Sequence, residues 1–252
     1  MAVIAILMIV SSMTIVLASL DDARSLALML DRESRRANVW REGHLASSEH
    51  QLSFYFEVAK APYVKTVCEV GFNAGHSAAV FLIANPNAHV ISFDLGQFDY
   101  SIRNLKLLQE LYPERFTYVL GDSAISVPAF AAQHPHLKCD LIAIDGDHSE
   151  RGALADIMNM AKLAACRNWV LVDDTGFKEV NSAWQRAKDM RVVYQSRCLA
   201  DLQPDINWQF LAKPEPRSWC LGWFSVNSID CPSWFDEGQE PYSNVTKCDI
   251  IA

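Results

Sequence analysis

The sequence VKTVCEVGFNAGHS at residues 64–77 joins a strand-forming segment to a helix-forming segment through a turn that contains two glycines. Residues 64–70 are rich in β-branched and apolar side chains and predict a strand. A helix is expected from about Gly75 to Ala84. Gly71 and Gly75 permit a positive φ and let a ligand approach the backbone closely. The run therefore predicts a ligand-binding turn between a strand and a helix.

Strands and helices continue to alternate on the C-terminal side of this turn. Apolar segments predict four further strands, at 88–94, 116–120, 140–144 and 169–172. A helix is expected at 101–111, and another from an apolar stripe with helical spacing at Leu154, Ile157, Met158 and Ala161. Five strands separated by helices predict a Rossmann-like, doubly wound α/β fold, with a mostly parallel sheet and helices on both faces.

The two ends of the chain differ from this pattern. Residues 1–20 carry no charged side chain and predict a signal peptide or a membrane anchor, with a buried N-terminal helix as the alternative. Residues 21–60 are expected to form a helical N-terminal extension. Residues 61–252 are assigned to the α/β domain, which ends in a loop-rich tail at about 200–252. In this tail 219–226 is the best strand candidate, and a hairpin of strands closing one edge of the sheet would fit.

The composition excludes one class of partner. The chain has 252 residues, a net charge of −8 and a pI near 5.3, and no cluster of lysines and arginines. A protein that neutralises nucleic-acid phosphates needs the opposite charge balance. We therefore expect a small-molecule substrate and no nucleic acid.

Seven cysteines and a glycosylation sequon bear on the cellular compartment. Cys68, Cys139 and Cys166 lie in or beside apolar segments and are expected to pack as small hydrophobic residues. One or two disulfides, of unassigned pairing, are expected among the cysteines of the last quarter, which are Cys198, Cys220, Cys231 and Cys248. Together with the sequon at 244–246 and the apolar leader, they favour the secretory pathway, with the protein either membrane-anchored or lumenal.

Acidic residues cluster at the ends of the predicted strands. They are Glu69, Asp94, Asp122, Asp145, Asp173 and Asp174. Ligands of open α/β sheets bind beyond the carboxyl ends of the strands, where the loops converge. These side chains are therefore expected to line one shared hollow.

The first turn differs from that of a dinucleotide oxidoreductase, because it lacks the pattern Gly-x-Gly-x-x-Gly that admits a pyrophosphate. Instead, Glu69 precedes Gly71 and suits a ligand with a cationic amino group. Asp94 follows Gly75 by nineteen residues, close to the spacing of about 20 at which a carboxylate reaches a ribose diol in this kind of fold.

These features resemble the class I S-adenosylmethionine-dependent methyltransferases, whose first motif matches Glu69-x-Gly71-x-x-x-Gly75. More narrowly, residues 68–77, 121–123, 144–149 and 172–175 are similar to a small family grouped with macrocin-type and catechol-type O-methyltransferases. The similarity covers about 49–184. Catechol-type enzymes have an asparagine where Asp174 stands, whereas the macrocin-type pattern has an aspartate, so the chain is more similar to the latter.

The resemblance implies roles for individual residues. The methionine end of S-adenosylmethionine would be held by Glu69 and by the loop that contains Gly71, Asn73, Gly75, His76 and Ser77. Asp94 would bind the ribose hydroxyls, and Asp122 and Ser123 would border the adenine. Asp145, Asp173 and Asp174 would match the three metal ligands, with Asp145 also bordering the cofactor.

Elementary chemistry agrees with a metal at this position. Three converging carboxylates repel one another unless a cation lies between them, and Mg²⁺ prefers oxygen ligands. A metal lowers the pKa of bound water from about 15.7 toward 7, and a bound substrate hydroxyl should be acidified similarly. His148, three residues after Asp145, is the candidate general base, with a role in orienting the next helix as the alternative. Helix capping is the alternative for Asp147 and Asp174.

The function expected from the sequence is metal-assisted O-methylation of a small hydroxylated or sugar-like molecule. One alternative is a hydroxylase-like relative that uses the same carboxylate site. Another is a non-catalytic binding protein built on a methyltransferase scaffold.

Overall fold

The structure is a computed structural model that describes residues 19–36, 45, 48–201, 217–226 and 231. The apolar leader up to residue 18, the sequon at 244–246 and Cys248 lie outside the described residues.

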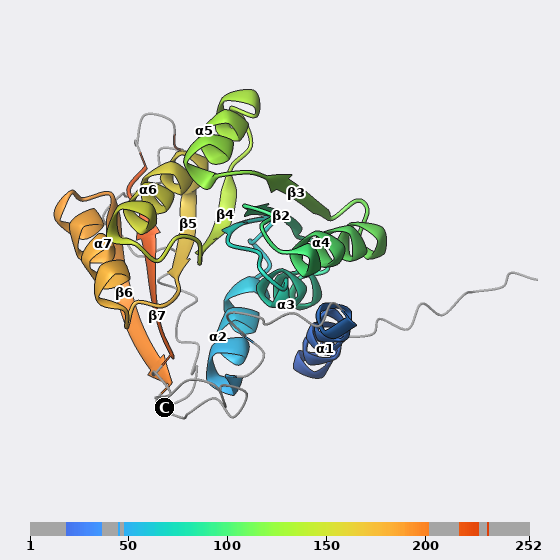
Figure 1. Cartoon of the computed structure of the whole chain (residues 1–252). Coiled ribbons are helices and arrows are strands. Elements are labelled where there is room, and N and C mark those ends of the chain that lie inside the picture. Colours follow the sequence, from blue (N-terminus) through green and yellow to red (C-terminus); the bar gives the residue numbers. More distant parts are fainter. Residues whose placement is uncertain (1–18, 37–44, 46–47, 202–216, 227–230, 232–252) are drawn as a thin grey trace, which may run out of the picture.

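One seven-stranded sheet forms the centre of the molecule (Figure 1). Its order is β3-β2-β1-β4-β5-β7-β6. The strands are β1 (Thr66–Val70), β2 (His89–Asp94), β3 (Phe116–Leu120), β4 (Cys139–Ile144), β5 (Ala164–Val172), β6 (Val193–Asp201) and β7 (Arg217–Phe224). The first five pair in parallel, whereas β7 pairs antiparallel with both β5 and β6. The expected α/β sheet and the late strand are confirmed, and the antiparallel pair at one edge consists of β7 and β6, a strand that the sequence did not predict.

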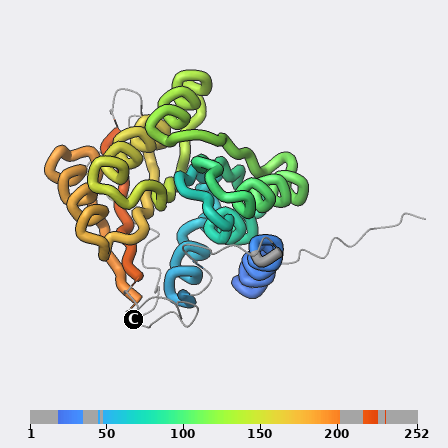
Figure 2. Tube along the Cα trace, in the orientation of Figure 1, coloured from blue at the N-terminus to red at the C-terminus, as the bar shows by residue number. Residues whose placement is uncertain are grey.

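Helices cover both faces of the sheet, as a doubly wound fold requires. The α-helices of the described residues are α1 (Leu20–Arg36), α2 (Glu49–Ala59), α3 (His76–Ala84), α4 (Asp99–Leu111), α5 (Ser123–Gln133), α6 (Glu150–Met160) and α7 (Lys178–Asp189). Side chains of α1 to α4 share one hydrophobic core with the sheet, and those of α5 to α7 share a second core on its other face. The Cα trace in Figure 2 shows α1 outermost on its side, packed beyond α3.

Polar contacts fasten the outer helix α1 to the elements beneath it. The buried amide of Asn104 on α4 donates to the carbonyl oxygens of Leu30 at 3.2 Å and Ala74 at 2.8 Å, and to the hydroxyl of Ser34 at 3.2 Å. Because Ala74 belongs to the glycine-containing turn after β1, Asn104 links α1 to that turn.

Three elements were not located by the sequence. They are α5, α7 and β6. Helix α5 contains Pro128 in its sixth position, which masked a helical pattern. Strand β6 is an edge strand in which only the two end residues are buried, and its middle is polar, so it carries no long apolar run.

The expectation for the sheet cysteines is wrong, because they form disulfides. Cys68 pairs with Cys139 and joins β1 to β4, and Cys166 pairs with Cys231. A third disulfide joins Cys198 on β6 to Cys220 on β7. A buried apolar neighbourhood suits a disulfide as well as a free thiol, so hydrophobicity alone could not separate the two.

Within the described residues, no helix is long and apolar enough to cross a lipid bilayer.

The described residues contain six cysteines, all paired, and the chain has seven, so at most one thiol can remain free. We expect the unfolded, unreduced protein to take up no more than one equivalent of iodoacetamide, and the reduced protein seven, as counted by mass spectrometry. Uptake of three or more equivalents without reductant would contradict the disulfide assignment.

Candidate functional site

The turn after β1 lies directly against the end of β4. The backbone amide of Asp145 donates to the carbonyl oxygen of Val70 at 2.9 Å, which brings the two strand ends together. A Cβ on Gly71 would overlap the carbonyl oxygen of Asp145, and the φ of Gly71 is +92°. Asn73 (φ 49°) and Gly75 (φ 86°) also have left-handed backbones. Glycine at 71 is therefore required both by conformation and by the close approach of the next loop.

Glu69 is buried beneath this turn rather than open to it. Its carboxylate accepts hydrogen bonds from the hydroxyls of Ser77 at 2.7 Å and Ser92 at 2.5 Å. Burial raises its pKa from an ordinary value of 4.5 to about 7, although the two hydroxyls act in the opposite direction. A positive charge placed above the turn would favour the ionised form. A cationic ligand above the turn would therefore increase the fraction of Glu69 that carries a negative charge.

His76 faces away from the turn. Its Nε2 lies 2.9 Å from Oδ1 of Asp31 on α1, and both side chains are buried. This pair joins α1 to the first residue of α3. The cofactor contact expected for His76 remains a prediction, and the structure gives its Nε2 atom a partner on α1.

Asp94 holds the backbone of the turn. Its Oδ2 accepts from the amides of Phe72 at 3.0 Å and Asn73 at 2.9 Å, and its Oδ1 accepts from Gly96 at 2.7 Å. The side chain of Asn73 in turn accepts from the hydroxyl of Tyr100 at 2.6 Å. Asp94 lies at the carboxyl end of β2 and fixes the backbone of the turn, and its expected contact with a ribose stays a prediction.

Asp122 and Ser123 begin α5, at the carboxyl end of β3. Asp122 is the N-cap, and its side chain accepts from the amide of Ala124 at 2.9 Å. The hydroxyl of Ser123 donates to the buried Asp156 at 2.6 Å. Both residues lie on the same edge of the sheet as Asp94, and their expected place beside the adenine stays a prediction.

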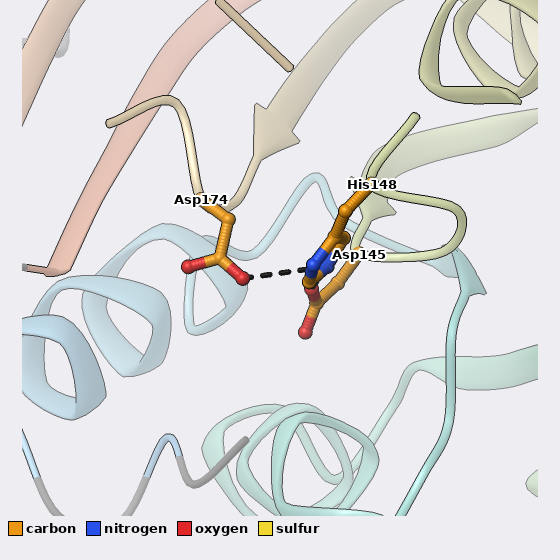
Figure 3. Close-up of side chains that lie close together, drawn as sticks. All are labelled: Asp145, His148 and Asp174. Atoms are coloured by element: carbon orange, nitrogen blue, oxygen red, sulfur yellow. Dashed lines mark hydrogen bonds and ion pairs between the residues drawn. The ribbon is translucent and has the colours of Figure 1, made fainter. Parts of the chain in front are cut away.

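Asp145, His148 and Asp174 form a compact group in which one potential ligand atom from each residue lies within 4.8 Å of the others (Figure 3). Nε2 of His148 lies 3.4 Å from Oδ1 of Asp145 and 3.3 Å from Oδ2 of Asp174. The hydrogen bond to Asp145 and the charges of both carboxylates raise the pKa of His148 to about 9. The imidazolium therefore occupies the place of a cation between two carboxylates.

Asp173 lies beside this group but is not a member of it. Its Oδ1 accepts from Nε2 of the buried Gln51 at 2.6 Å and from the backbone amide of Asp174 at 2.8 Å. Burial and the charge of Asp174 raise its pKa to about 7, while Arg217 opposes the shift. The three carboxylates expected to act as a metal triad thus converge on one place, yet His148 takes the third position in the compact group.

Two alternatives from the sequence can be compared with the geometry. Helix α6 is capped by Ser149, and Asp147 accepts from the amide of Ser149 in the preceding turn at 2.7 Å. The N-cap position of α7 is Phe177, not Asp174. The carboxylate of Asp174 is therefore directed to His148 rather than used as a helix cap.

Three neighbours of the group were missed by sequence analysis. Gln51, on α2, contacts Asp173 across 122 residues of chain, and Arg217 donates to Gln51 Oε1 at 3.1 Å. The ring of Phe177 stacks on His148 at a centroid distance of 5.7 Å. No local pattern marks these residues, because their role depends on contacts between distant segments.

Residues 68–175 match the model of a protein family described as a methyltransferase domain. This segment begins at β1 and ends just after Asp174, so it contains the turn and the acidic group. Among curated proteins, no sequence matches the chain.

Solved structures of methyltransferases share the fold. An O-methyltransferase from Bacillus cereus in complex with SAH is 12% identical, with a TM-score of 0.61 over 79% of this chain and 90% of the other. TomG, an O-methyltransferase from Streptomyces achromogenes in complex with SAM, is 15% identical, with a TM-score of 0.62 over 84% and 93%. A precorrin-6y C5,15-methyltransferase from Geobacter metallireducens is 10% identical, with a TM-score of 0.52 over 75% and 95%. At these identities the likeness establishes the fold alone.

Replacing Gly71 by alanine should destabilise the protein by about 3 kcal/mol, since the new Cβ adds both backbone strain and a clash with Asp145. Gly121→Ala is the matched control, because its φ is +129° but its Cβ would meet only Ser126, at 3.9 Å. Urea denaturation compares the two variants. Equal losses of unfolding free energy in the two variants would show that the clash with Asp145 does not contribute to the effect at Gly71.

Glu69→Gln should change how stability depends on pH. Because the pKa of Glu69 is about 7 when folded and near 4.5 when unfolded, folding favours the protonated form. The wild-type free energy of unfolding should therefore fall relative to that of Glu69→Gln as the pH rises from about 4.5 to about 7, and the difference should level off above that. Chemical denaturation at several pH values measures this difference in unfolding free energy. A difference that does not change with pH would contradict the raised pKa of Glu69.

Proposed function

We propose that this chain, whose residues 68–175 match a methyltransferase-domain model, transfers a methyl group from S-adenosylmethionine to a hydroxyl oxygen of a small molecule with the help of a divalent metal. One observation carries the proposal: the Asp145–His148–Asp174 group lies beside the Gly71 turn, at the carboxyl ends of adjacent strands. The O-methyltransferases that share the fold support an oxygen acceptor, although the same fold also occurs in a precorrin methyltransferase.

The Gly71 turn and the acids around it suit the cofactor. S-adenosylmethionine supplies an electrophilic methyl group on a sulfonium, together with a cationic amino group. The turn offers close backbone approach, and Glu69 beneath it gains its negative charge when a positive group lies above. Asp94, at the end of β2, is placed for the ribose hydroxyls, and Asp122 and Ser123 for the adenine. Each of these contacts is a prediction.

The acidic group suits a divalent cation. Asp145 and Asp174 place carboxylate oxygens within 4.8 Å of each other, so they can share a cation. Carboxylate oxygens suit both Mg²⁺ and Mn²⁺. When bound, the metal would act as a Lewis acid that makes an acceptor hydroxyl more acidic. Partial burial and repulsion from Asp173 raise the pKa of Asp145, while His148 opposes the shift. A divalent cation beside Asp145 would relieve this repulsion.

In this structure the protonated ring of His148 is the cation between the carboxylates of Asp145 and Asp174. Its pKa of about 9 means that the ring carries a proton at neutral pH, so it must lose that proton before it can act as a general base. A cation between Asp145 and Asp174 would oppose the imidazolium, so metal binding should release the proton. The neutral ring would then be ready to accept the proton of an acceptor hydroxyl.

A hydroxylase-like activity at the same carboxylates is the second candidate, since two carboxylates and a histidine also bind redox-active metals. Product analysis separates the two, because methylation adds a methyl group and hydroxylation adds an oxygen atom. A binding protein without activity would show cofactor binding and no turnover of any acceptor.

We further propose an oxidising, secretory compartment for the protein, either lumenal or tethered through residues 1–20. Three disulfides among the described residues support this, because disulfides persist outside the reducing cytosol. The apolar leader and the sequon at 244–246 point to the same compartment.

Asp145→Asn should reduce methyl transfer at least about 100-fold, since it removes a charge at the point where the hydroxyl is activated. Binding of S-adenosylmethionine, measured by calorimetry, should persist. Turnover is measured with radiolabelled cofactor and a panel of hydroxylated acceptors, with Mg²⁺ or Mn²⁺ and with a chelator.

Asp147→Asn is the matched control, because Asp147 lies two residues away and is bonded to the amide of Ser149 outside the group. It should retain turnover. A folded wild-type protein that does not bind S-adenosylmethionine would refute the proposed function, and unchanged turnover in Asp145→Asn would refute the metal role.

A further inference from the structure

A relay of hydrogen bonds links β7 and α2 to the turn that carries Asp174. Arg217, on β7, donates from Nη1 to Oε1 of Gln51 at 3.1 Å. Gln51 donates from Nε2 to Oδ1 of Asp173 at 2.6 Å, and the same oxygen accepts from the backbone amide of Asp174 at 2.8 Å. Gln51 is fully buried and Asp173 is 9% exposed. The relay is thus an internal structure rather than a surface contact.

The relay acts on the backbone that aims the Asp174 carboxylate. Asp174 has a φ of 55°, a left-handed conformation that is unfavourable for a residue with a side chain. Surrounding contacts must hold such a conformation in place. The bond from the Asp174 amide to Asp173 is one such contact, and it leaves the Asp174 carboxylate 3.3 Å from His148.

The same relay occupies Oδ1 of Asp173. An oxygen that already accepts from a side-chain amide and a backbone amide is directed toward those donors. Asp145, His148 and Asp174 bring their ligand atoms together without Asp173. This arrangement differs from the three-carboxylate triad that the resemblance implies.

We propose that Gln51 is a positioning residue for the acidic group, and that Asp173 holds the Asp174 turn instead of ligating the metal. The metal part of this inference rests on the proposed function; the orientation of Asp174 toward His148 does not. Helix α2, which precedes the sheet in the chain, therefore contributes to the site: its Gln51 fixes the orientation of the Asp174 carboxylate.

Other contacts hold α2 in place, so one of its hydrogen bonds can be removed without detaching the helix. The hydroxyl of Ser48 donates to the buried Asp201 on β6 at 2.6 Å. The guanidinium of Arg197, also on β6, lies over the ring of Phe54 at 5.5 Å from its centroid. Gln51→Met, which keeps the length of the side chain and loses its amide, should therefore fold.

The first experiment compares Mn²⁺ affinity, measured by electron paramagnetic resonance, in four variants of the full chain. Gln51→Met should weaken Mn²⁺ binding about 10-fold, the lower end of what loss of a group behind a metal ligand costs. Asp173→Asn should stay within about threefold of wild type, because the amide oxygen of asparagine can still accept from Gln51 and Asp174. Asp145→Asn should lose binding. Arg197→Met, which removes the contact of the guanidinium with Phe54 on the same helix and touches no bond of Gln51, is the control and should bind as wild type does.

The second experiment needs no metal. The imidazole NMR signals of His148 at pH 7 in the metal-free protein report how the Asp174 carboxylate is held. Gln51→Met should shift or broaden these signals, whereas Arg197→Met should leave them unchanged.

The outcomes separate this inference from the proposed function. If Asp173→Asn loses Mn²⁺ as fully as Asp145→Asn does, Asp173 is a ligand and the inference fails. It also fails if Gln51→Met changes neither the Mn²⁺ affinity nor the His148 signals. If wild type binds no Mn²⁺, the metal role in the proposed function fails, and the His148 signals alone decide whether Gln51 positions the group.

Discussion

The contact of the Gly71 turn with the carbonyl oxygen of Asp145 is the constraint on which the site depends. It occurs where the sheet order changes direction, between β1 and β4, so the loops that follow these strands leave toward opposite faces. A side chain at position 71 would push the loops apart. Their close approach places a turn suited to a cationic cofactor against a carboxylate suited to a metal.

Electrostatics sets what this edge of the sheet can bind. Glu69 and Asp173 have pKa values near 7 because burial penalises their charge, and the pKa of Asp145 is raised as well. His148 gains a proton for the complementary reason, since two carboxylates surround it. An edge with this excess of acids favours ligands that bring positive charge, and both a sulfonium cofactor and a divalent metal do so.

The parts of the fold that follow from local pattern could be predicted. The strand expected at 116–120 is β3, and the acids at the strand ends lie on one edge because parallel strands end together. Helix α5 and the edge strand β6 were not predicted, because a proline interrupts the pattern of α5 and a polar stretch interrupts that of β6. The hydrogen-bond relay through Gln51 could not be predicted from the sequence for a different reason. Its members lie far apart in the chain, and their contacts exist only after α2 packs beside β5 and β7.

The most direct test of a shared cofactor and metal site is the effect of Mn²⁺ on the NMR signal of S-adenosylmethionine labelled with ¹³C in its transferable methyl group. A paramagnetic ion held by Asp145 and Asp174, beside the Gly71 turn, should strongly broaden the bound methyl signal, and Asp145→Asn should abolish the broadening. A bound cofactor whose methyl signal stays sharp at saturating Mn²⁺ would contradict a common site for the metal and the methyl donor.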